Sequence, residues 1–232
     1  MLRALALAAA GLCLTLTLAN PALADDHDRQ AWGNVTYQGP INGKLMLWLE
    51  GQGRFGDNAG RLTQSIIRPG VGWQVAPRLS LWAGYGRITN HNPGKDQAED
   101  RLWQQALWNV GKLGDAAITS RTRLEQRQVD GGDDTGWRVR QFLKYDRPFN
   151  VGAPPGGAAP SLVLTSEAFL ALGDADWGAR SGFDQIRNFA GVGFSVAPKA
   201  RFEIGYMNQY INRPGDNDRM NHIASVNLFG RF

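Results

Sequence analysis

The sequence has few of the residues that build covalent cross-links or catalytic dyads. It holds one cysteine, Cys13, and three histidines among 232 residues. A single cysteine excludes an internal disulfide framework. Long apolar runs are also absent after the first 24 residues, so no later segment is predicted to span a membrane as a helix. What remains is a closed β-barrel in a membrane or, alternatively, a soluble periplasmic fold.

The first 24 residues have the pattern of a secretory signal peptide. Arg3 gives a short basic start, an apolar run covers 4–18, and Ala22-Leu23-Ala24 is a small-residue cleavage site. A membrane anchor is the alternative, but about 15 apolar residues fall short of the ~20 that a spanning helix needs. We therefore predict that residues 1–24 are cleaved near Ala24. Cys13 is lost with them, which leaves the mature chain without cysteine.

The composition of the remaining chain favours a large all-β domain close to a membrane interface. Glycine is abundant (29 residues), as are tryptophan (8), phenylalanine (10) and tyrosine (5). Glycine suits strongly twisted, closely packed strands, and aromatic side chains anchor at membrane interfaces. The net charge of +4 is only weak evidence for an anionic partner, and we do not predict nucleic-acid binding from it.

Apolar residues alternate with polar ones through most of the chain, as expected for half-buried strands. In 43–55, Leu45, Leu47 and Leu49 share one face while Glu50 and Arg54 share the other. Similar segments follow, and the last one ends on an aromatic residue, Phe232, as outer-membrane barrels do. We predict that Phe232 is recognised by the barrel-assembly machinery. The further strand segments are 61–75, 78–88, 101–112, 116–129, 136–148, 161–173, 185–197, 200–211 and 224–232.

The connections between these segments alternate in length. Tight turns are predicted at 76–78, 112–115 and 197–199, and longer polar loops lie between them. Short turns at one end and long loops at the other are typical of outer-membrane barrels, whose short turns face the periplasm. The Pro- and Gly-rich stretch 150–160 is predicted to be an insertion on the short side. The long loops are 89–100, 130–135, 173–184 and 212–220.

These observations predict one antiparallel transmembrane β-barrel over residues 43–232. The segments add up to ten strands, which return both ends of the barrel to the periplasm. Residues 25–42 are predicted to be an N-terminal segment with an extra strand at 30–38, because an eleventh crossing would place the N-terminus outside. A barrel of twelve strands is the alternative.

Several motifs resemble those of a proteobacterial outer-membrane family catalogued only as a domain of unknown function, number twenty-four-ninety. They span nearly all of the mature chain. The resemblance implies an outer-membrane barrel in a Gram-negative cell envelope, and it implies no activity, cofactor or catalytic residue. The matching stretches are RPGVGW at 68–73, RLWQQ at 101–105, RTRLEQR at 121–127, GWRVRQ at 136–141, DWGARSGFDQIR at 176–187, GYMNQY at 205–210 and NLFGRF at 227–232.

The predicted inner face is rich in charge, and basic residues outnumber acidic ones there. A charge facing lipid at the bilayer midplane would cost ~2–4 kcal/mol, so these residues must point inward or lie at the rim. The basic residues are Lys44, Arg54, Arg68, Arg121, Arg123, Arg127, Arg138, Arg140, Lys144 and Arg187, and the acidic ones are Glu50, Glu125, Asp146, Glu167 and Glu203.

Two interpretations of this interior stay open. It is either a salt-bridged plug that fills a narrow barrel, or a narrow anion-preferring channel or small-ligand cavity whose arginines bind carboxylate or phosphate groups. The candidate lumen network comprises Arg68, Arg121, Arg123, Glu125, Arg127, Arg138, Arg140, Lys144, Glu167 and Arg187.

An outer-membrane lipid or lipopolysaccharide hydrolase is the alternative function. His27 is predicted in the N-terminal tail, His91 in a solvated loop, and His222 at the start of the last strand. His222 and Ser225 are three residues apart, which directs them to opposite faces of a strand and excludes a direct dyad. A triad assembled across strands stays open. No catalytic residue or cofactor is predicted.

The acidic loops offer no complete metal site. Asp174 and Asp176 are spaced like calcium ligands, but no full ligand loop follows. Such loops could bridge divalent cations to lipopolysaccharide phosphates, although ordinary solvated turns explain them more simply. A third function is a structural barrel that acts through its loops. The predicted partners are outer-membrane lipid and lipopolysaccharide, and the oligomeric state is open.

Overall fold

The computed structural model describes residues 26–152, 159–213, 215 and 217–231. The predicted signal peptide and the terminal Phe232 lie outside the described residues. Within the described ranges no helix has the length and apolar character to cross a membrane. The strands are β1 (Asp26–Asn42), β2 (Leu45–Gly56), β3 (Arg61–Ala76), β4 (Leu79–Asn90), β5 (Gln97–Leu113), β6 (Ala116–Val129), β7 (Gly136–Pro148), β8 (Ser161–Ala171), β9 (Gly182–Ala197), β10 (Ala200–Ile211) and β11 (Arg219–Gly230).

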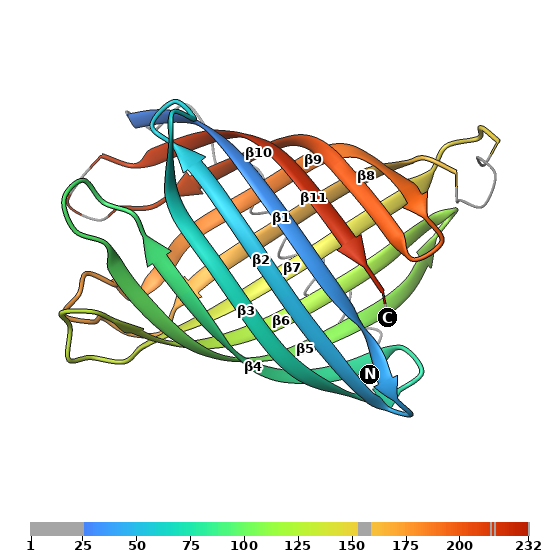
Figure 1. Cartoon of the computed structure of the whole chain (residues 1–232), viewed down its shortest axis with the longest axis horizontal. Coiled ribbons are helices and arrows are strands. Elements are labelled where there is room, and N and C mark those ends of the chain that lie inside the picture. The colour runs from blue at the N-terminus through green and yellow to red at the C-terminus, as the bar shows by residue number, and fades with distance from the viewer. Residues whose placement is uncertain (1–25, 153–158, 214, 216, 232) are drawn as a thin grey trace.

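These eleven strands close into one barrel (Figure 1). Neighbouring strands in the chain pair in antiparallel fashion, and closure comes from a parallel pairing of β1 with β11. In that register Ala31 lies opposite Ala224. On its other side β1 pairs with β2, with Ala31 opposite Phe55. The barrel therefore has no free sheet edge among the described strands.

The predicted strand number of ten is wrong, and so is the alternative of twelve. The prediction leaves residues 25–42 out of the ten-strand wall, because an odd number of strands puts the two chain ends at opposite ends of the barrel. It forms β1, whose alternation places Trp32 and Thr36 inside while Val35 and Tyr37 stay exposed. Asp26 consequently lies beside Arg219, the first residue of β11, while Gly230, the last residue of β11, lies at the opposite end of the barrel.

The two ends of the barrel differ in their connections, as expected. Two-residue turns follow β1, β3, β5 and β9, and this side is called the short-turn end. The connections after β4, β6, β8 and β10 are longer, and they form the long-loop end together with the turn at 57–60. The insertion predicted at 150–160 does lie on the short-turn side, between β7 and β8. Its residues 153–158 are outside the described part of the chain.

Apolar side chains cover the outside of the barrel wall. Ile67, Val71 and Leu102 are exposed by 68%, 56% and 58%. The interior instead contains a tryptophan cluster and many charged groups. Trp48 contacts Trp82 and Trp103 edge-on, with ring centroids 5.6 and 6.2 Å apart. A barrel with apolar residues outside and charged residues inside is inverted relative to a soluble protein.

Glycine makes room for these tryptophans. A Cβ atom on Gly72 would lie 2.4 Å from the Trp82 ring, and one on Gly84 would lie 2.4 Å from the Trp103 ring. Real Cβ atoms do not approach other atoms so closely, so both positions need glycine. Part of the high glycine content of the sequence is thus explained on β3 and β4, where wide indole rings pack against the inner wall.

Candidate functional site

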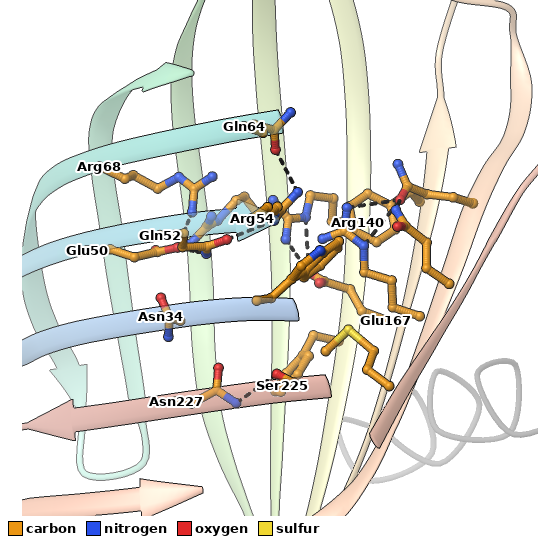
Figure 2. Close-up of a pocket in the computed structure, with 18 of the residues that line it drawn as sticks. Asn34, Glu50, Gln52, Arg54, Gln64, Arg68, Arg140, Glu167, Ser225 and Asn227 are labelled. Carbon is orange, nitrogen blue, oxygen red and sulfur yellow. Dashed lines mark hydrogen bonds and ion pairs between the residues drawn. The ribbon is translucent and has the colours of Figure 1, made fainter. Parts of the chain in front are cut away.

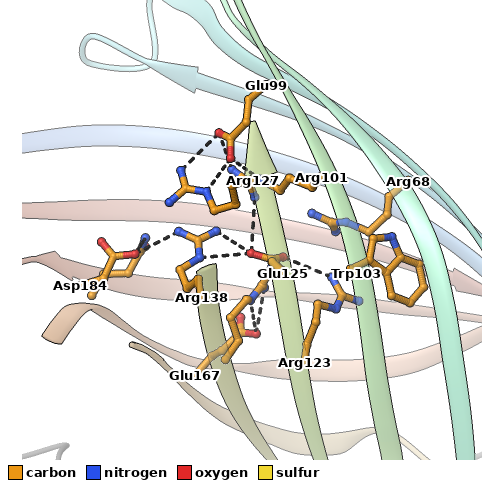
Figure 3. A network of polar contacts seen from close by, with 12 residues as sticks. Arg68, Glu99, Arg101, Trp103, Arg123, Glu125, Arg127, Arg138, Glu167 and Asp184 are labelled. Carbon is orange, nitrogen blue, oxygen red and sulfur yellow. Dashed lines mark hydrogen bonds and ion pairs between the residues drawn. The ribbon is translucent and has the colours of Figure 1, made fainter. Parts of the chain in front are cut away.

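Glu125 of β6 lies at the centre of a buried network of ion pairs (Figure 3). Its side chain is fully buried, and its two oxygens lie 2.7 Å from Arg138 Nη2 and 2.7 Å from Arg140 Nη1. Arg123 and Arg101 are at 4.0 and 3.9 Å. Because β6 and β7 are paired strands, alternate residues of both point into the same interior.

The network extends to further strands through shared carboxylates. Glu167 of β8 accepts from Arg121 at 2.6 Å and from Arg140 at 3.0 Å. On the other side, Glu99 of β5 accepts from Arg101 at 2.7 Å and from Arg127 at 2.5 Å. Glu99 links β5 to β6, and Glu167 links β8 to β6 and β7, so the network braces strands β5 to β8 from inside. Further pairs are Arg68–Glu50, Arg138–Asp184, Lys144–Glu203 and Arg201–Asp146.

The structure brings the candidate residues of the lumen network together inside the barrel. Each of them takes part in an ion pair or lines the interior cavity described below; their role in ligand binding stays a prediction. The sequence interpretation omitted Glu99, Arg101, Asp184 and Arg201, and it included Lys44, which lies exposed in the turn between β1 and β2. The spacing of Glu99, Arg101 and Trp103 was a usable signal, but the expected loop was drawn as far as residue 100.

A polar cavity of about 550 Å³ lies beside the network (Figure 2). It is lined from β1 and β2 by Trp32, Asn34, Gln52 and Arg54, and from β9 by Arg187. Several network residues, including Arg121, Arg140 and Glu167, form another part of its wall. The interior is therefore neither an empty tube nor completely filled by side chains.

Two arginines in this cavity lack an acidic partner. Arg54 donates to Gln64 at 2.7 Å and Gln52 at 2.8 Å, and Arg187 donates to Gln185 at 3.0 Å. Both guanidinium groups lie over the Trp32 ring, 3.9 and 5.0 Å from its centroid. Among the described residues, no carboxylate oxygen lies within 4.0 Å of either group. Neither guanidinium group therefore forms an ion pair, although Arg187 lies opposite Glu167 in the register of β8 and β9, which balances part of its charge at longer range.

A family of proteins of unknown function, DUF2490, matches residues 29–221 of this chain. The chain belongs to this family. It is also 37% identical to an uncharacterised protein of Methylorubrum extorquens over 233 residues, which cover all of both chains. No solved structure gives a significant match. The resemblance inferred from the motifs is confirmed, and it brings no activity with it.

In this family member, two of the three histidines form a pair on the outside of the barrel. His27 does not lie in a tail, because β1 carries it to a position where its Nδ1 atom is 3.1 Å from His222 Nε2. His222 also contacts the Tyr206 hydroxyl at 2.7 Å. Ser225 points the other way, is 2% exposed and lines the cavity. The expectation that His222 and Ser225 occupy opposite faces is met.

The acidic loops of the long-loop end use their carboxylates to hold each other. Asp176 accepts the backbone N–H groups of Asp133 at 2.8 Å and Asp134 at 3.2 Å. These hydrogen bonds, that from Asp133 foremost, lower the pKa of Asp176. Trp177 donates to the Asp134 carbonyl at 2.9 Å, so its role is loop packing. The described residues contain no group of three His, Cys, Asp or Glu that could hold a metal ion.

Proposed function

We propose that this protein is an integral outer-membrane barrel that takes small anions into its cationic interior. The membrane placement is supported by the exposed apolar wall and the buried charges, which have the arrangement that a lipid surrounding requires. The short-turn end then faces the periplasm and the long-loop end faces outward. A signal peptide cleaved near Ala24 would deliver the chain to the outer membrane.

One observation carries the anion proposal. Arg54 and Arg187 both face the cavity, and neither guanidinium group forms an ion pair with a carboxylate of the described residues. A buried cation is costly to desolvate unless a counter-charge is close. The five N–H donors of each guanidinium are only partly used by glutamine, which leaves donors for a carboxylate or phosphate ligand. A small anion between them would complete the same pairing that Glu125 gives to Arg138 and Arg140.

The two interpretations of the interior are compatible. The ion pairs around Glu125 and Glu167 form a plug-like wall, and the cavity lies next to that wall. This favours a narrow anion-preferring passage or binding cavity over a wide pore. Arg121 and Arg140 extend the positive lining along the wall, although Glu167 balances part of their charge.

Anion uptake is tested on the purified full chain with inorganic phosphate as the probe. Phosphate titration should change the tryptophan fluorescence, because Trp32 lies against both arginines. The double variant Arg54→Gln/Arg187→Gln should weaken phosphate binding by at least ~10-fold, since each charged hydrogen bond contributes ~1.5–3 kcal/mol. In planar bilayers with a salt gradient, any conductance should favour chloride in the wild type and lose that preference in the variant.

Arg87→Gln provides the matched control. Arg87 is an exposed arginine on β4 that pairs with Asp100 on the outer side of the wall. Its replacement should leave phosphate binding and ion preference unchanged. The proposal fails if the wild type neither binds phosphate nor shows anion preference, or if the control and the double variant behave alike.

A further inference from the structure

Ser65, His91 and Asp96 form a hydrogen-bonded chain at the long-loop end of β3 and β4. Ser65 Oγ lies 3.0 Å from His91 Nε2, and His91 Nδ1 lies 2.9 Å from Asp96 Oδ2. An ionised carboxylate can only accept, so Asp96 fixes the proton on Nδ1 and leaves Nε2 free to accept from the serine hydroxyl. This order of atoms is that of a Ser-His-Asp triad.

The backbone holds His91 in place. His91 follows the end of β4, as expected for a loop residue, but its backbone N–H donates to the Thr63 carbonyl at 2.8 Å. Arg61 Nη1 donates to the His91 carbonyl at 2.5 Å. The histidine side chain is 28% exposed, so it is half-buried while remaining open to solvent. An imidazole whose backbone is fixed by two hydrogen bonds, and whose ring is still accessible, is suited to proton transfer.

Ser65 faces the outside of the barrel, beside a trough made by glycines. Ser65 is paired with Gly53 of β2, which is paired in turn with Gly33 of β1. Gly51 lies opposite Ile67, two residues further along β3. A Cβ atom added to Gly33 or Gly51 would meet nothing within 4 Å, so the outer surface is open at both glycines. One added to Gly53 would contact Leu62 and Phe55 at 3.7 and 3.8 Å, so these two side chains border the trough beside Ser65.

The trough continues into an apolar groove of about 350 Å³. Its walls are aliphatic and aromatic side chains that the barrel exposes on its outer face, and Ile67 connects the groove to Ser65. A groove of this size and character accommodates a hydrocarbon chain. The lining residues are Val35, Tyr37, Leu49, Gly51, Ile67 and Pro69, with Glu50 contributing between them.

We infer that Ser65, His91 and Asp96 are the catalytic triad of a hydrolase that cleaves fatty-acyl esters at the outer face of the barrel. The inference relies on the membrane placement proposed above and is independent of the anion cavity. Ser65 lies near the long-loop end of β3, which that placement puts at the outer leaflet. An acyl chain would lie in the glycine trough and the groove, with its ester carbonyl at Ser65.

The reaction needs only water as a second substrate. Ser65 Oγ attacks the carbonyl carbon while its proton passes to His91 Nε2. The bond to the alcohol oxygen then breaks, and His91 returns the proton to that oxygen. Water attacks the acyl-serine, gives one proton to His91, and the free acid leaves as Ser65 regains its proton. Asp96 keeps the imidazole oriented throughout and stabilises its charged form.

The oxyanion of the intermediate needs a donor. Thr89 of β4 lies directly opposite Ser65 in the strand register, and cross-strand partners share a face. We assign its hydroxyl this role. Thr89→Val should therefore lower the hydrolysis rate by ~10²-fold or more without preventing labelling of Ser65.

The test uses the purified full chain in detergent micelles and two readouts. A fluorophosphonate probe should label the wild type covalently at Ser65, and labelling should be lost in Ser65→Ala and His91→Ala. Fatty-acid release is measured from dipalmitoyl phosphatidylethanolamine in one arm and from lipopolysaccharide in the other. Release from at least one lipid is expected, and Ser65→Ala should reduce it on the order of 10⁴-fold or more.

A serine variant serves as the control. Ser166→Ala removes another serine of the wall, on β8. It should keep labelling and release at the wild-type level, and phosphate binding should survive Ser65→Ala. The inference is overturned if the probe still labels Ser65→Ala, or if the wild type releases fatty acid from neither lipid.

Discussion

Replacing Glu125 with leucine should destabilise the barrel by about 3–5 kcal/mol, because removal of one partner leaves buried cations uncompensated. Glu125 is fully buried and serves Arg138 and Arg140 directly. Arg138 and Arg140 keep Asp184 and Glu167 as partners, but each loses a bond of 2.7 Å. The free energy of unfolding, from denaturant titration of the reconstituted barrel, measures the effect.

The matched control for this prediction is Asp100→Asn. Asp100 forms an ion pair with Arg87 in which both side chains are well exposed, at 38% and 46%. Exposed pairs contribute ~0–1 kcal/mol, so the control should stay close to the wild type. If Glu125→Leu also falls within 1 kcal/mol of the wild type, the ion-pair network does not brace the barrel in the way described.

Val71→Arg should cost about 2–4 kcal/mol if hydrocarbon surrounds the barrel wall, since that is the cost of arginine facing the bilayer midplane. Val71 lies on β3 between Leu47 and Ala83 of its neighbouring strands and is 56% exposed. In a protein surrounded by water, an exposed valine can be replaced by arginine within about ±0.5 kcal/mol. The same unfolding assay therefore separates the two environments.

Val151→Arg is the control for this substitution. Val151 has the same exposed fraction, 56%, but it lies in the connection after β7, outside the strands. It should tolerate arginine with little change in stability. Equal effects at both valines would show that exposure alone, and not lipid contact, determines the cost.

The faces of the strands were predictable because alternation is a local property. In β2, the period of two was enough to assign Leu47 and Leu49 to the outside and Glu50 to the inside. The arginines of β6 and β7 followed in the same way. One face of each strand is charged and the other is apolar. Every strand register that keeps the charged face inward therefore places the same side chains inside the barrel.

The number of strands was not predictable from the same pattern. Residues 30–38 had the alternation of a strand, but an assumption about where the N-terminus must lie excluded them from the barrel. The parallel pairing of β1 with β11 permits an odd number of strands, because it joins two strands that run in the same direction. No periodicity in the sequence reports which strands meet at the closure.

The cluster of Ser65, His91 and Asp96 was missed for a related reason. Ser65 and His91 are 26 residues apart, and their contact depends on the register of β3 with β4. Alternation within one strand shows whether a side chain points inward or outward, but it does not show which residue of the neighbouring strand lies opposite. The predicted strand ended at residue 88, which placed His91 in the loop 89–100, whereas β4 extends to Asn90 and the His91 N–H still pairs with the Thr63 carbonyl.

The central claim is that lipid covers the apolar outer wall, and fractionation of cells that produce the full chain tests it most directly. The protein should stay with the outer membrane after the periplasmic contents are released, and it should leave the membrane only in detergent. Recovery of the chain as a monodisperse protein in the detergent-free periplasmic fraction would contradict the lipid-covered wall.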